Sequence, residues 1–376
     1  MEENKKIKIG IVTYYYDSIN YGGVLQAYAL TQKIDSLGYN VEQICYKKEN
    51  DDKVSNKKYL YLIKKFIKKI IILWCYLKMS RRYNRFKKFR DEIPHSMNVY
   101  TDNNIENTIK DYDIFVTGSD QVWNLTWFCP AFFLEFVSKN KKKLSYAASL
   151  GRMVLAEEEK NFFKKVLLNY SAISVREKDA VELLKNQTSL KIEHVLDPTL
   201  LLKKEEWDKI SNEYTIEKPY LFCYFIGEDR VIRKLAKKYA KKYNLKLVVL
   251  PHPAGFNFTD INFGDIKTFD AGPKEFISLI KNADYIMTDS FHACVFSTIY
   301  QKEFFAFQRN GKKEMSSRIY SLLNLFEAEN HFCDMENKLN IKYIENLERI
   351  DYTKDKNKFD KIYKKSIDYL ISNLSN

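Results

Sequence analysis

The sequence predicts an α/β protein that contains two successive parallel α/β units. The chain has 376 residues, about two and a half times the ~150 residues of a typical domain, so two domains are expected. Its hydrophobic fraction is 45%, with only 11 glycines and 7 prolines, which is typical of a chain that folds throughout. Strand patterns and helix patterns also alternate along both halves, as they do in parallel sheets with crossover helices.

The first unit begins with a β-rich segment, Lys6–Tyr16, followed by a glycine turn. Helix-forming residues then run over Val24–Leu37 until Gly38 ends the helix, and Val41–Tyr46 supplies a second strand. Strand, turn and helix in this order begin a βαβ sheet. Further strands are predicted at Tyr112–Thr117, Lys143–Ala147, Ala172–Val175 and His194–Leu196, with helices at Glu157–Asn169 and Lys178–Lys185.

The second unit is predicted to begin after a boundary at Lys203–Lys218, because Pro219 opens a fresh strand, Tyr220–Ile226. The same alternation follows, with helices Val231–Tyr243, Pro273–Asn282 and Phe291–Tyr300 and strands Leu245–Leu250, Ala283–Met287 and Glu303–Phe307. We therefore expect an N-terminal domain at 1–210, a C-terminal domain at 211–330 and an extension at 331–376. The extension ends in the helix Lys358–Leu374.

A strongly basic stretch, 53–90, interrupts the first unit. It contains fourteen Lys and Arg residues and no acidic residue, and the whole chain has a net charge of +13. Such a balance favours anionic partners. Residues 59–79 are compatible with an amphipathic helix that packs on the first domain with solvated lysines, or with one that contacts an anionic membrane peripherally. We expect no nucleic-acid partner, because no helix-turn-helix, zinc or RNP-like motif accompanies the basic stretch.

The cysteines and the apolar segments indicate a cytoplasmic protein. Six cysteines are spread without a C-x-x-C pair or a metal-ligand spacing, so we expect buried free thiols in a reducing compartment and no metal site. The first residues, MEENKKIKIG, have no apolar core of an export signal. The longest apolar run, Ile70–Leu77, is far shorter than the ~20 residues that span a bilayer.

Unusual polar residues follow the predicted strands at their carboxyl ends, where parallel sheets bind ligands. They are Asn20, Gly22 and Gly23 after the first strand, Ser119, Asp120 and Gln121 after the third, and then Arg176, Asp197, Ser290 and His292. Each has a structural alternative: the glycines can form a simple turn, the aspartates can cap helices, and Arg176 can pair with Glu177 at the surface.

His292 is the sharpest candidate for catalysis. Ser290 or Asp289 is a good N-cap, which places His292 in the first turn of a helix. The helix dipole there disfavours the imidazolium, so a neutral imidazole is ready to exchange a proton. The alternative is a buried core histidine, because Phe291, Ala293 and Val295 surround it in the sequence.

Six short motifs, by their sequences, their order and their spacing, resemble the polysaccharide pyruvyl transferase family over about residues 7–326. They are Asn20-Tyr-Gly-Gly-Val-Leu-Gln-Ala-Tyr-Ala-Leu30, Thr117-Gly-Ser-Asp-Gln-Val-Trp-Asn124, Ser145-Tyr-Ala-Ala-Ser149, Ser174-Val-Arg-Glu177, Leu196-Asp-Pro-Thr199 and Thr288-Asp-Ser-Phe-His-Ala293. The resemblance implies two Rossmann-like domains that face each other across a cleft, similar to GT-B glycosyltransferases. It also implies transfer of the enolpyruvyl part of phosphoenolpyruvate to sugar hydroxyls of a cell-surface polysaccharide or its precursor, usually as a cyclic ketal.

The resemblance assigns roles residue by residue. The family's histidine falls on His292, with Ser290 before it, which makes His292 the acid/base candidate. An arginine that family members commonly carry just before this histidine is replaced by Phe291, so Arg318 and Arg176 are expected to hold the donor anions, with Arg152 and Arg309 behind them. Asp120 is a second catalytic candidate, and the substrate-binding candidates are Asn20, Gly22, Gly23, Ser119, Gln121, Arg176, Asp197, Ser290 and Arg318.

The partners implied are phosphoenolpyruvate, as donor substrate rather than cofactor, and a saccharide acceptor that is either free or lipid-linked at the inner face of the membrane. Two alternatives stay open from the sequence. One is a GT-B glycosyltransferase that uses a nucleotide sugar. The other is a non-catalytic scaffold of polysaccharide assembly, because Phe291 could mark lost catalysis.

Overall fold

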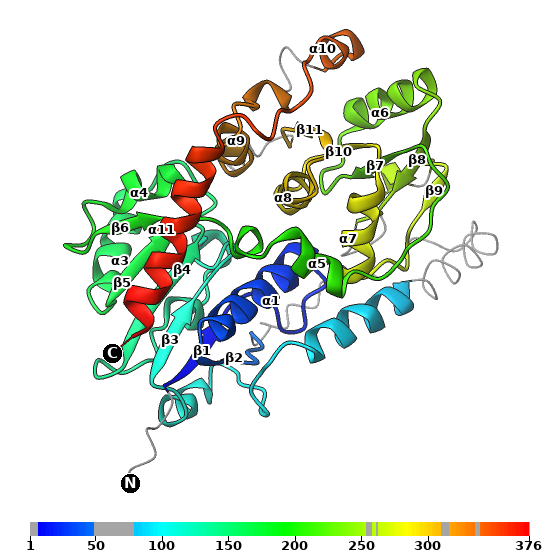
Figure 1. Ribbon diagram of the computed structural model, residues 1–376. Coiled ribbons are helices and arrows are strands. Elements are labelled where there is room, and N and C mark those ends of the chain that lie inside the picture. Colours follow the sequence, from blue (N-terminus) through cyan, green and yellow to red (C-terminus); the bar gives the residue numbers. More distant parts are fainter. Residues whose placement is uncertain are drawn as a thin grey trace, which may run out of the picture.

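A computed structural model describes residues 7–48, 79–252, 258–260, 262–309, 316–334 and 339–375 of the chain. Two parallel six-stranded sheets form the two units, and helices cover them (Figure 1). The α/β class that the alternating patterns predict is thus confirmed. The predicted membrane contact at 59–79 lies outside the described residues apart from its last one, while residues 79–91 are helical.

The first sheet has the strand order β2-β1-β3-β4-β5-β6. Its inner strands β1, β3 and β5 are mostly buried and apolar, as parallel strands covered on both faces are, whereas the edge strands β2 and β6 are more polar. Their bounds are β1 Lys8–Val12, β2 Asn40–Gln43, β3 Ile114–Thr117, β4 Lys142–Ala148, β5 Ala172–Val175 and β6 Ile192–His194. The helices of this unit are α1 Tyr21–Ser36, α3 Glu157–Leu167 and α4 Lys178–Leu184, with short 3₁₀ turns at Ile105–Lys110, Leu125–Trp127, Pro130–Phe133 and Pro198–Leu201.

The second sheet has the order β12-β11-β10-β7-β8-β9. Its strands are β7 Tyr220–Tyr224, β8 Lys246–Val249, β9 Ile266–Lys267, β10 Tyr285–Thr288, β11 Glu303–Phe307 and β12 Phe332–Cys333. Its helices are α6 Arg230–Lys242, α7 Pro273–Asn282, α8 Phe291–Ile299, α9 Ser317–Asn324 and α10 Ile341–Glu345, and 3₁₀ turns lie at Phe258–Asp260 and Glu329–His331. The helix α5, Lys204–Ile210, joins the two units.

Both sheets reverse their strand order at a comparable place. The chain moves from β1 outward to β2 and then returns to β3 on the other side of β1; likewise β7 is followed by β8 on one side and is flanked by β10 on the other. Loops on the two sides of such a switch point diverge and leave a crevice at the carboxyl ends of the strands. The loops after β1, β3, β7 and β10 are therefore the ones that the fold makes available to a ligand.

Helix α1 of the first unit also packs against the second unit. It contacts α7 and α8 of the second unit, and Tyr21 at its start stacks on Phe276 with ring centroids 4.8 Å apart. The hydroxyl of Tyr21 donates to the carbonyl of Ala271 at 2.5 Å. One buried apolar cluster consequently runs through both units, whereas two others lie within single units.

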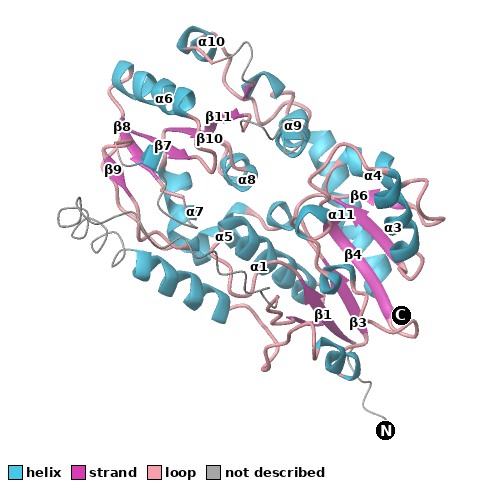
Figure 2. Cartoon of the chain, turned by 180° about the vertical axis from the view of Figure 1, so that it is seen from behind, coloured by secondary structure: helices cyan, strands magenta, loops and turns pink. Residues whose placement is uncertain are grey.

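The last helix, α11 (Lys356–Leu374), returns to the first unit. Figures 1 and 2 show it lying against the first sheet, beside β4 and β6. Tyr369 donates its hydroxyl to the carbonyl of Ser145 at 2.9 Å, and the hydroxyl of Ser366 accepts from the backbone of Leu196. Although the sequence places this helix in a C-terminal extension, it forms part of the covering of the first sheet.

Several predicted elements differ from the observed ones. The first strand ends at Val12, so Thr13–Ile19 form a loop at the crevice rather than a continuation of the strand. The strand predicted at His194–Leu196 lies at Ile192–His194, and α5 occupies part of the predicted boundary segment. The two-residue strands β9 and β12 and the helix α9 were not predicted. The two strands are too short to produce a clear periodic pattern.

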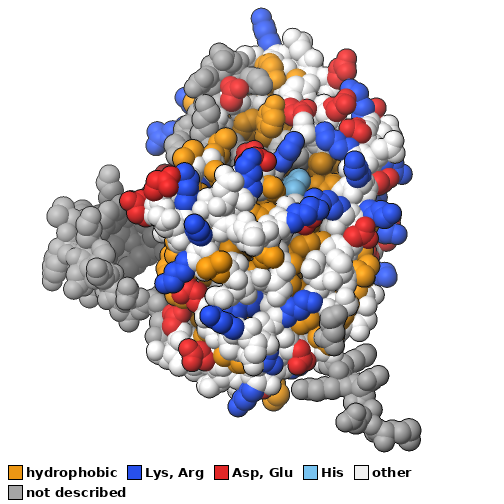
Figure 3. Space-filling model, turned by 90° about the vertical axis from the view of Figure 1, so that its left-hand side faces the viewer, with side chains coloured by type: hydrophobic (Ala, Val, Ile, Leu, Met, Phe, Trp, Pro, Cys, Tyr) orange, Lys and Arg blue, Asp and Glu red, His pale blue; other side chains and the backbone are white. Residues whose placement is uncertain are grey.

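The surface carries the positive charge that the composition indicates, and Figure 3 shows Lys and Arg side chains across the middle of one face, around exposed hydrophobic side chains. The cysteines within the described residues, Cys45, Cys129, Cys223, Cys294 and Cys333, are buried and free. Among the described helices, none combines the length and the apolar character that crossing a membrane requires.

Candidate functional site

A cavity of about 440 Å³ opens between the two units at the carboxyl ends of both sheets. Loops after β1, β2 and β3 line it from the first unit, and loops after β7, β10 and β11 line it from the second. The lining residues are Tyr14, Ser18, Asn20, Lys48, Asp120, Gln121, Trp127, Ile226, Ser290, Phe291, His292, Arg309 and Arg318. The site is thus assembled from segments that are far apart in the sequence.

Helix α8 begins at this cavity. Ser290 is its N-cap, and the hydroxyl of Ser290 accepts from the backbone of Ala293 at 3.5 Å. His292 consequently lies in the first turn, as the sequence predicts, and it is 7% exposed. The positive end of the α8 dipole and its first N–H groups face the cavity, which favours an anion there.

Helix α1 begins opposite α8, and its first turn touches His292. Asn20 caps α1 by accepting from the backbone of Gly23 at 3.3 Å. A Cβ at Gly22 would come within 1.9 Å of Nδ1 of His292. Glycine is therefore required at position 22 because the imidazole occupies the space of a side chain. A Cβ at Gly23 would come within 2.6 Å of the carbonyl of Tyr14. Both glycines permit close packing and neither lines the cavity.

Beneath His292 lies the buried carboxylate of Asp197. Nε2 of His292 is 3.6 Å from Oδ2 of Asp197 and has no hydrogen-bond partner among the described residues. The same Oδ2 accepts from Arg176 at 2.7 Å and from the hydroxyl of Ser119 at 3.1 Å, and Thr199 donates to Oδ1. Burial opposes ionisation of Asp197, but His292 and Arg176 outweigh it and hold the pKa of this carboxyl well below its usual range.

Arg176 is the central cation of this buried network. Besides Asp197, its guanidinium approaches Glu177 at 3.4 Å and Asp120 at 3.6 Å. Burial alone would lower the pKa of Arg176, but the three carboxylates raise it, so the side chain stays charged. The ion pair with Glu177 considered from the sequence is therefore present, but its expected place at the surface is wrong, because Arg176 is only 5% exposed and lies in the wall of the site.

Phe291 lies where the resemblance of the sequence implies an arginine, and two arginines flank its ring. The guanidinium carbon of Arg176 is 4.6 Å from the ring centroid, and that of Arg318 is 5.5 Å from it. Cations placed over an aromatic face are attracted by its quadrupole. The phenylalanine consequently does not leave this part of the site without positive charge.

Arg318 and Arg309 bring cations from the second unit to the cavity. Arg318 lies in α9, and burial together with the neighbouring Arg176 lowers its pKa to about 10, so it is protonated at neutral pH. When the amide of Gln121 is oriented with its oxygen toward Arg318, that oxygen accepts from both terminal nitrogens, at 3.1 and 3.2 Å. Arg309 is held by the carbonyl of Asp289, which accepts from Nε and Nη2 at 3.1 and 3.0 Å.

Lys48 is the third cation at the cavity and comes from the first unit. Its ammonium donates to the carbonyl of Phe128 at 2.8 Å. Asp120 is the one carboxylate among the residues that line the cavity, and its backbone is in the left-handed region, with φ 64°. Two aromatic side chains complete the lining: the hydroxyl of Tyr14 donates to the carbonyl of Trp127 at 3.1 Å, and Trp127 is 42% exposed.

The structure brings the predicted site residues together in two layers. Asn20, Asp120, Gln121, Ser290, His292 and Arg318 line the cavity, whereas Ser119, Arg176 and Asp197 lie directly behind it. Arg152, named as a reserve cation, pairs with Glu159 and is not among the lining residues. Tyr14, Lys48 and Trp127 also line the cavity but were not predicted as site residues. Tyr14 falls inside the predicted first strand, Lys48 follows the second predicted strand by two residues, and Trp127 lies three residues beyond the motif that ends at Asn124, so no motif marked them.

Comparisons with known proteins agree with this geometry. A family model described as "Polysaccharide pyruvyl transferase" matches residues 20–311. The UDP-GlcNAc 2-epimerase of Methanocaldococcus jannaschii, solved with UDP-GlcNAc and UDP, is 12% identical with a TM-score of 0.52, over 98% of this chain and 100% of that chain. S. aureus MnaA, solved with UDP, is 12% identical with a TM-score of 0.53, over 90% of this chain and 86% of that chain. No curated protein matches the chain. These structures share the fold: two Rossmann-like domains in the GT-B arrangement, as expected.

Proposed function

Because the chain belongs to the polysaccharide pyruvyl transferase family, we propose that it transfers the pyruvyl group of phosphoenolpyruvate to hydroxyls of a saccharide in the cavity between its two units. The observation that carries this proposal is the position of His292. It lies in the first turn of α8, beside a buried carboxylate, in a cavity that Lys48, Arg309 and Arg318 line.

The donor has a phosphate and a carboxylate, and the cavity offers cations from both units for them. We place these anions near Arg309, Arg318 and the N–H groups at the start of α8. Charge-assisted hydrogen bonds of this kind contribute roughly 1.5–3 kcal/mol each. This arrangement compensates for the arginine that Phe291 replaces, because the guanidinium of Arg318 lies over the Phe291 ring.

His292 is the acid/base in this proposal, and Asp197 positions it. Nε2 is buried and faces Asp197, so the carboxylate stabilises the protonated imidazole from which the substrate takes its proton. Protonation of the methylene carbon of phosphoenolpyruvate makes C2 electrophilic, and a sugar hydroxyl adds to C2. The proton of that hydroxyl restores His292 to its protonated form.

Loss of the phosphate and closure by a second hydroxyl complete the reaction. The C2–O bond to phosphate breaks as the second C2–O bond to the sugar forms, and the proton of the second hydroxyl leaves with inorganic phosphate. The sum is one phosphoenolpyruvate and one diol converted to one cyclic ketal and one phosphate. Tyr14 and Trp127 at the cavity are suited to the acceptor, because aromatic rings pack on the apolar faces of sugars.

The proposal is tested with phosphoenolpyruvate labelled in its carbon skeleton and a panel of saccharide acceptors. We expect the label to move to the acceptor and inorganic phosphate to appear only when an acceptor is present. Equilibrium binding of phosphoenolpyruvate and of UDP-GlcNAc is measured in parallel. If the protein binds UDP-GlcNAc but not phosphoenolpyruvate, the result favours the nucleotide-sugar enzyme. If it binds phosphoenolpyruvate but turns over none of the acceptors, the result favours the scaffold.

A further inference from the structure

A second cavity, of about 910 Å³, lies on the side of the molecule where α4, α9 and α11 meet. We propose that it binds the phosphate group of a phosphate-bearing saccharide and so holds the carrier end of the acceptor. The identification of the ligand as the acceptor rests on the function proposed above. The existence of the binding site does not, and it can be tested without any turnover.

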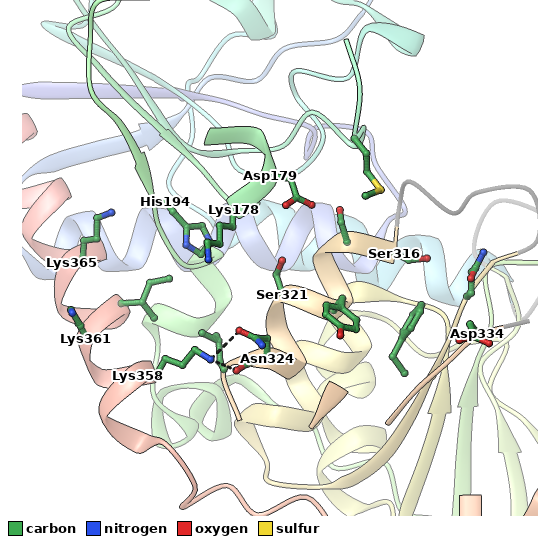
Figure 4. A pocket seen from close by; sticks show the side chains of 17 residues that line it. Lys178, Asp179, His194, Ser316, Ser321, Asn324, Asp334, Lys358, Lys361 and Lys365 are labelled. Atoms are coloured by element: carbon green, nitrogen blue, oxygen red, sulfur yellow. Dashed lines mark hydrogen bonds between the residues drawn. The ribbon is translucent and has the colours of Figure 1, made fainter. Parts of the chain in front are cut away.

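The cations of this cavity come from two helices of different parts of the chain. Lys358, Lys361 and Lys365 are spaced three and four residues apart, so they share one face of α11, and Lys178 enters from the start of α4. Figure 4 shows Lys358 reaching from α11 to Asn324 of α9, while Lys178 enters beside His194. Four ammonium groups thus line one cavity.

Two of these lysines are available for an anion. Lys365 pairs with Glu193, and Lys358 donates to the carbonyl and the side chain of Asn324. Neither Lys178 nor Lys361 makes an ion pair with any carboxylate of the described residues, and both are exposed. The carboxylates that line the cavity are Asp179 and Asp334. The lining cations outnumber them, which favours an anionic ligand.

The rest of the lining suits a saccharide. Tyr320 is 51% exposed on α9, and Ser321 and Asn324 stand on the same helix. An aromatic face beside hydroxyl and amide groups provides both stacking and hydrogen bonding for a sugar ring. His194 adds an uncharged ring, because burial lowers its pKa to about 4, and its Nε2 lies 3.1 Å from the carbonyl of Arg176.

A small void lies between this cavity and the reaction site and shares lining residues with each. Its volume is about 30 Å³, and Phe291 and Arg318, which also line the reaction cavity, form one side of it. His194, Ser321 and Ile362, which also line the second cavity, form another side of the void. The side chain of Arg318 therefore stands between the two cavities. A saccharide whose phosphate lies among the lysines therefore approaches Arg318 from the side opposite the donor.

The test is isothermal titration of the whole protein with N-acetylglucosamine 1-phosphate, with N-acetylglucosamine and glucuronic acid as uncharged and carboxylate comparisons. We expect the phosphate ester to bind and its affinity to fall as the salt concentration rises. Saturating phosphoenolpyruvate should leave this affinity unchanged. The double variant Lys178→Ala/Lys361→Ala should bind it about tenfold or more weakly. The matched control Lys164→Ala/Lys165→Ala, two exposed lysines of α3, should bind it as the wild type does.

Three results would overturn the site. The first is that the wild type does not bind the phosphate ester. The second is that the Lys178/Lys361 variant binds the ester as tightly as the wild type, and the third is that phosphoenolpyruvate displaces the ester. Equal binding of glucuronic acid would overturn the assignment to phosphate. UDP-GlcNAc and a short-chain isoprenyl diphosphate sugar are titrated next, and tighter binding of one supports the site and identifies a nucleotide or a lipid carrier. Failure of the proposed function is separate, because it would appear as absent phosphoenolpyruvate binding with the ester site intact.

Discussion

Asp197 is the residue on which the buried part of the site depends. It neutralises Arg176 and faces His292, with Oδ2 2.7 Å and 3.6 Å from the nearest nitrogens of the two side chains. Asp197→Asn keeps the shape and removes the charge, so Arg176 loses its closest counter-ion. We expect the free energy of unfolding to fall by roughly 3–5 kcal/mol and turnover to fall even in the folded fraction.

The Asp197 prediction is checked by chemical denaturation together with the pH dependence of turnover. Because the pKa of Asp197 is depressed in the folded state, its stabilising effect is complete above the unfolded value near 4 and is lost as the pH falls further. The variant should lose that part of the acid sensitivity. Wild-type stability and an unchanged pH–rate profile would contradict the role assigned to Asp197.

Gly22 makes a second prediction at this scale. Gly22→Ala places a Cβ within 1.9 Å of Nδ1 of His292, so either the imidazole or the start of α1 must move. We expect turnover to fall about tenfold or more, since displacement of a reacting group by about 1 Å can cost 10²-fold. Ser36→Ala, at the exposed end of α1, is the control. Equal turnover of the Gly22 variant and the control would show that the contact is dispensable.

At the scale of elements, we propose that the start of α8, Arg309 after β11 and Arg318 of α9 form one anion site. Arg309→Ala and Arg318→Ala should each raise the dissociation constant of phosphoenolpyruvate by about tenfold or more, because each removes a charge-assisted hydrogen bond worth roughly 1.5–3 kcal/mol. Direct titration measures this. Arg152→Ala, whose guanidinium pairs with Glu159, should leave donor affinity unchanged. If Arg152 alone matters, the donor lies elsewhere.

The elements also show what the sequence can and cannot predict. The strands around the site were predictable because their apolar runs end in polar loops, and Ser290 before an apolar helix placed His292 correctly at the start of α8. The burial of Arg176 was not predictable, since Asp120 and Asp197, two of its three carboxylate partners, come from loops that follow other strands. Lys48 and Trp127 reach the cavity only through the packing of the first unit, which no local pattern encodes.

For the whole molecule, α11 connects the second unit to the first, so its packing contributes to the stability of the pair. Leu370 is 2% exposed against the first unit, whereas its neighbour Ile371 is 47% exposed. Leu370→Ala should lower the free energy of unfolding by about 2–5 kcal/mol. Ile371→Ala should change it by less than about 0.5 kcal/mol. Denaturant titration compares the two variants, and equal stability would show that α11 does not contribute in this way.

The two-unit architecture makes a single site out of distant segments, because the carboxyl ends of both sheets open on the same cavity. The sequence indicated two parallel units, and the resemblance to a family indicated how they face each other. The contact of Gly22 with His292 is a property of the assembled molecule, since these residues start helices of different units. Residue spacing within either unit gives no information about it.

The most direct test of the central claim is acceptor-dependent release of phosphate from phosphoenolpyruvate by the wild type and by His292→Ala, with donor binding and folding measured on the same samples. We expect the variant to stay folded, to bind the donor within about twofold of the wild type, and to lose roughly 10²–10⁴-fold in turnover, as expected for a general acid. Unchanged turnover per folded molecule would contradict this claim and would make His292 a core residue of the interface between α1 and α8.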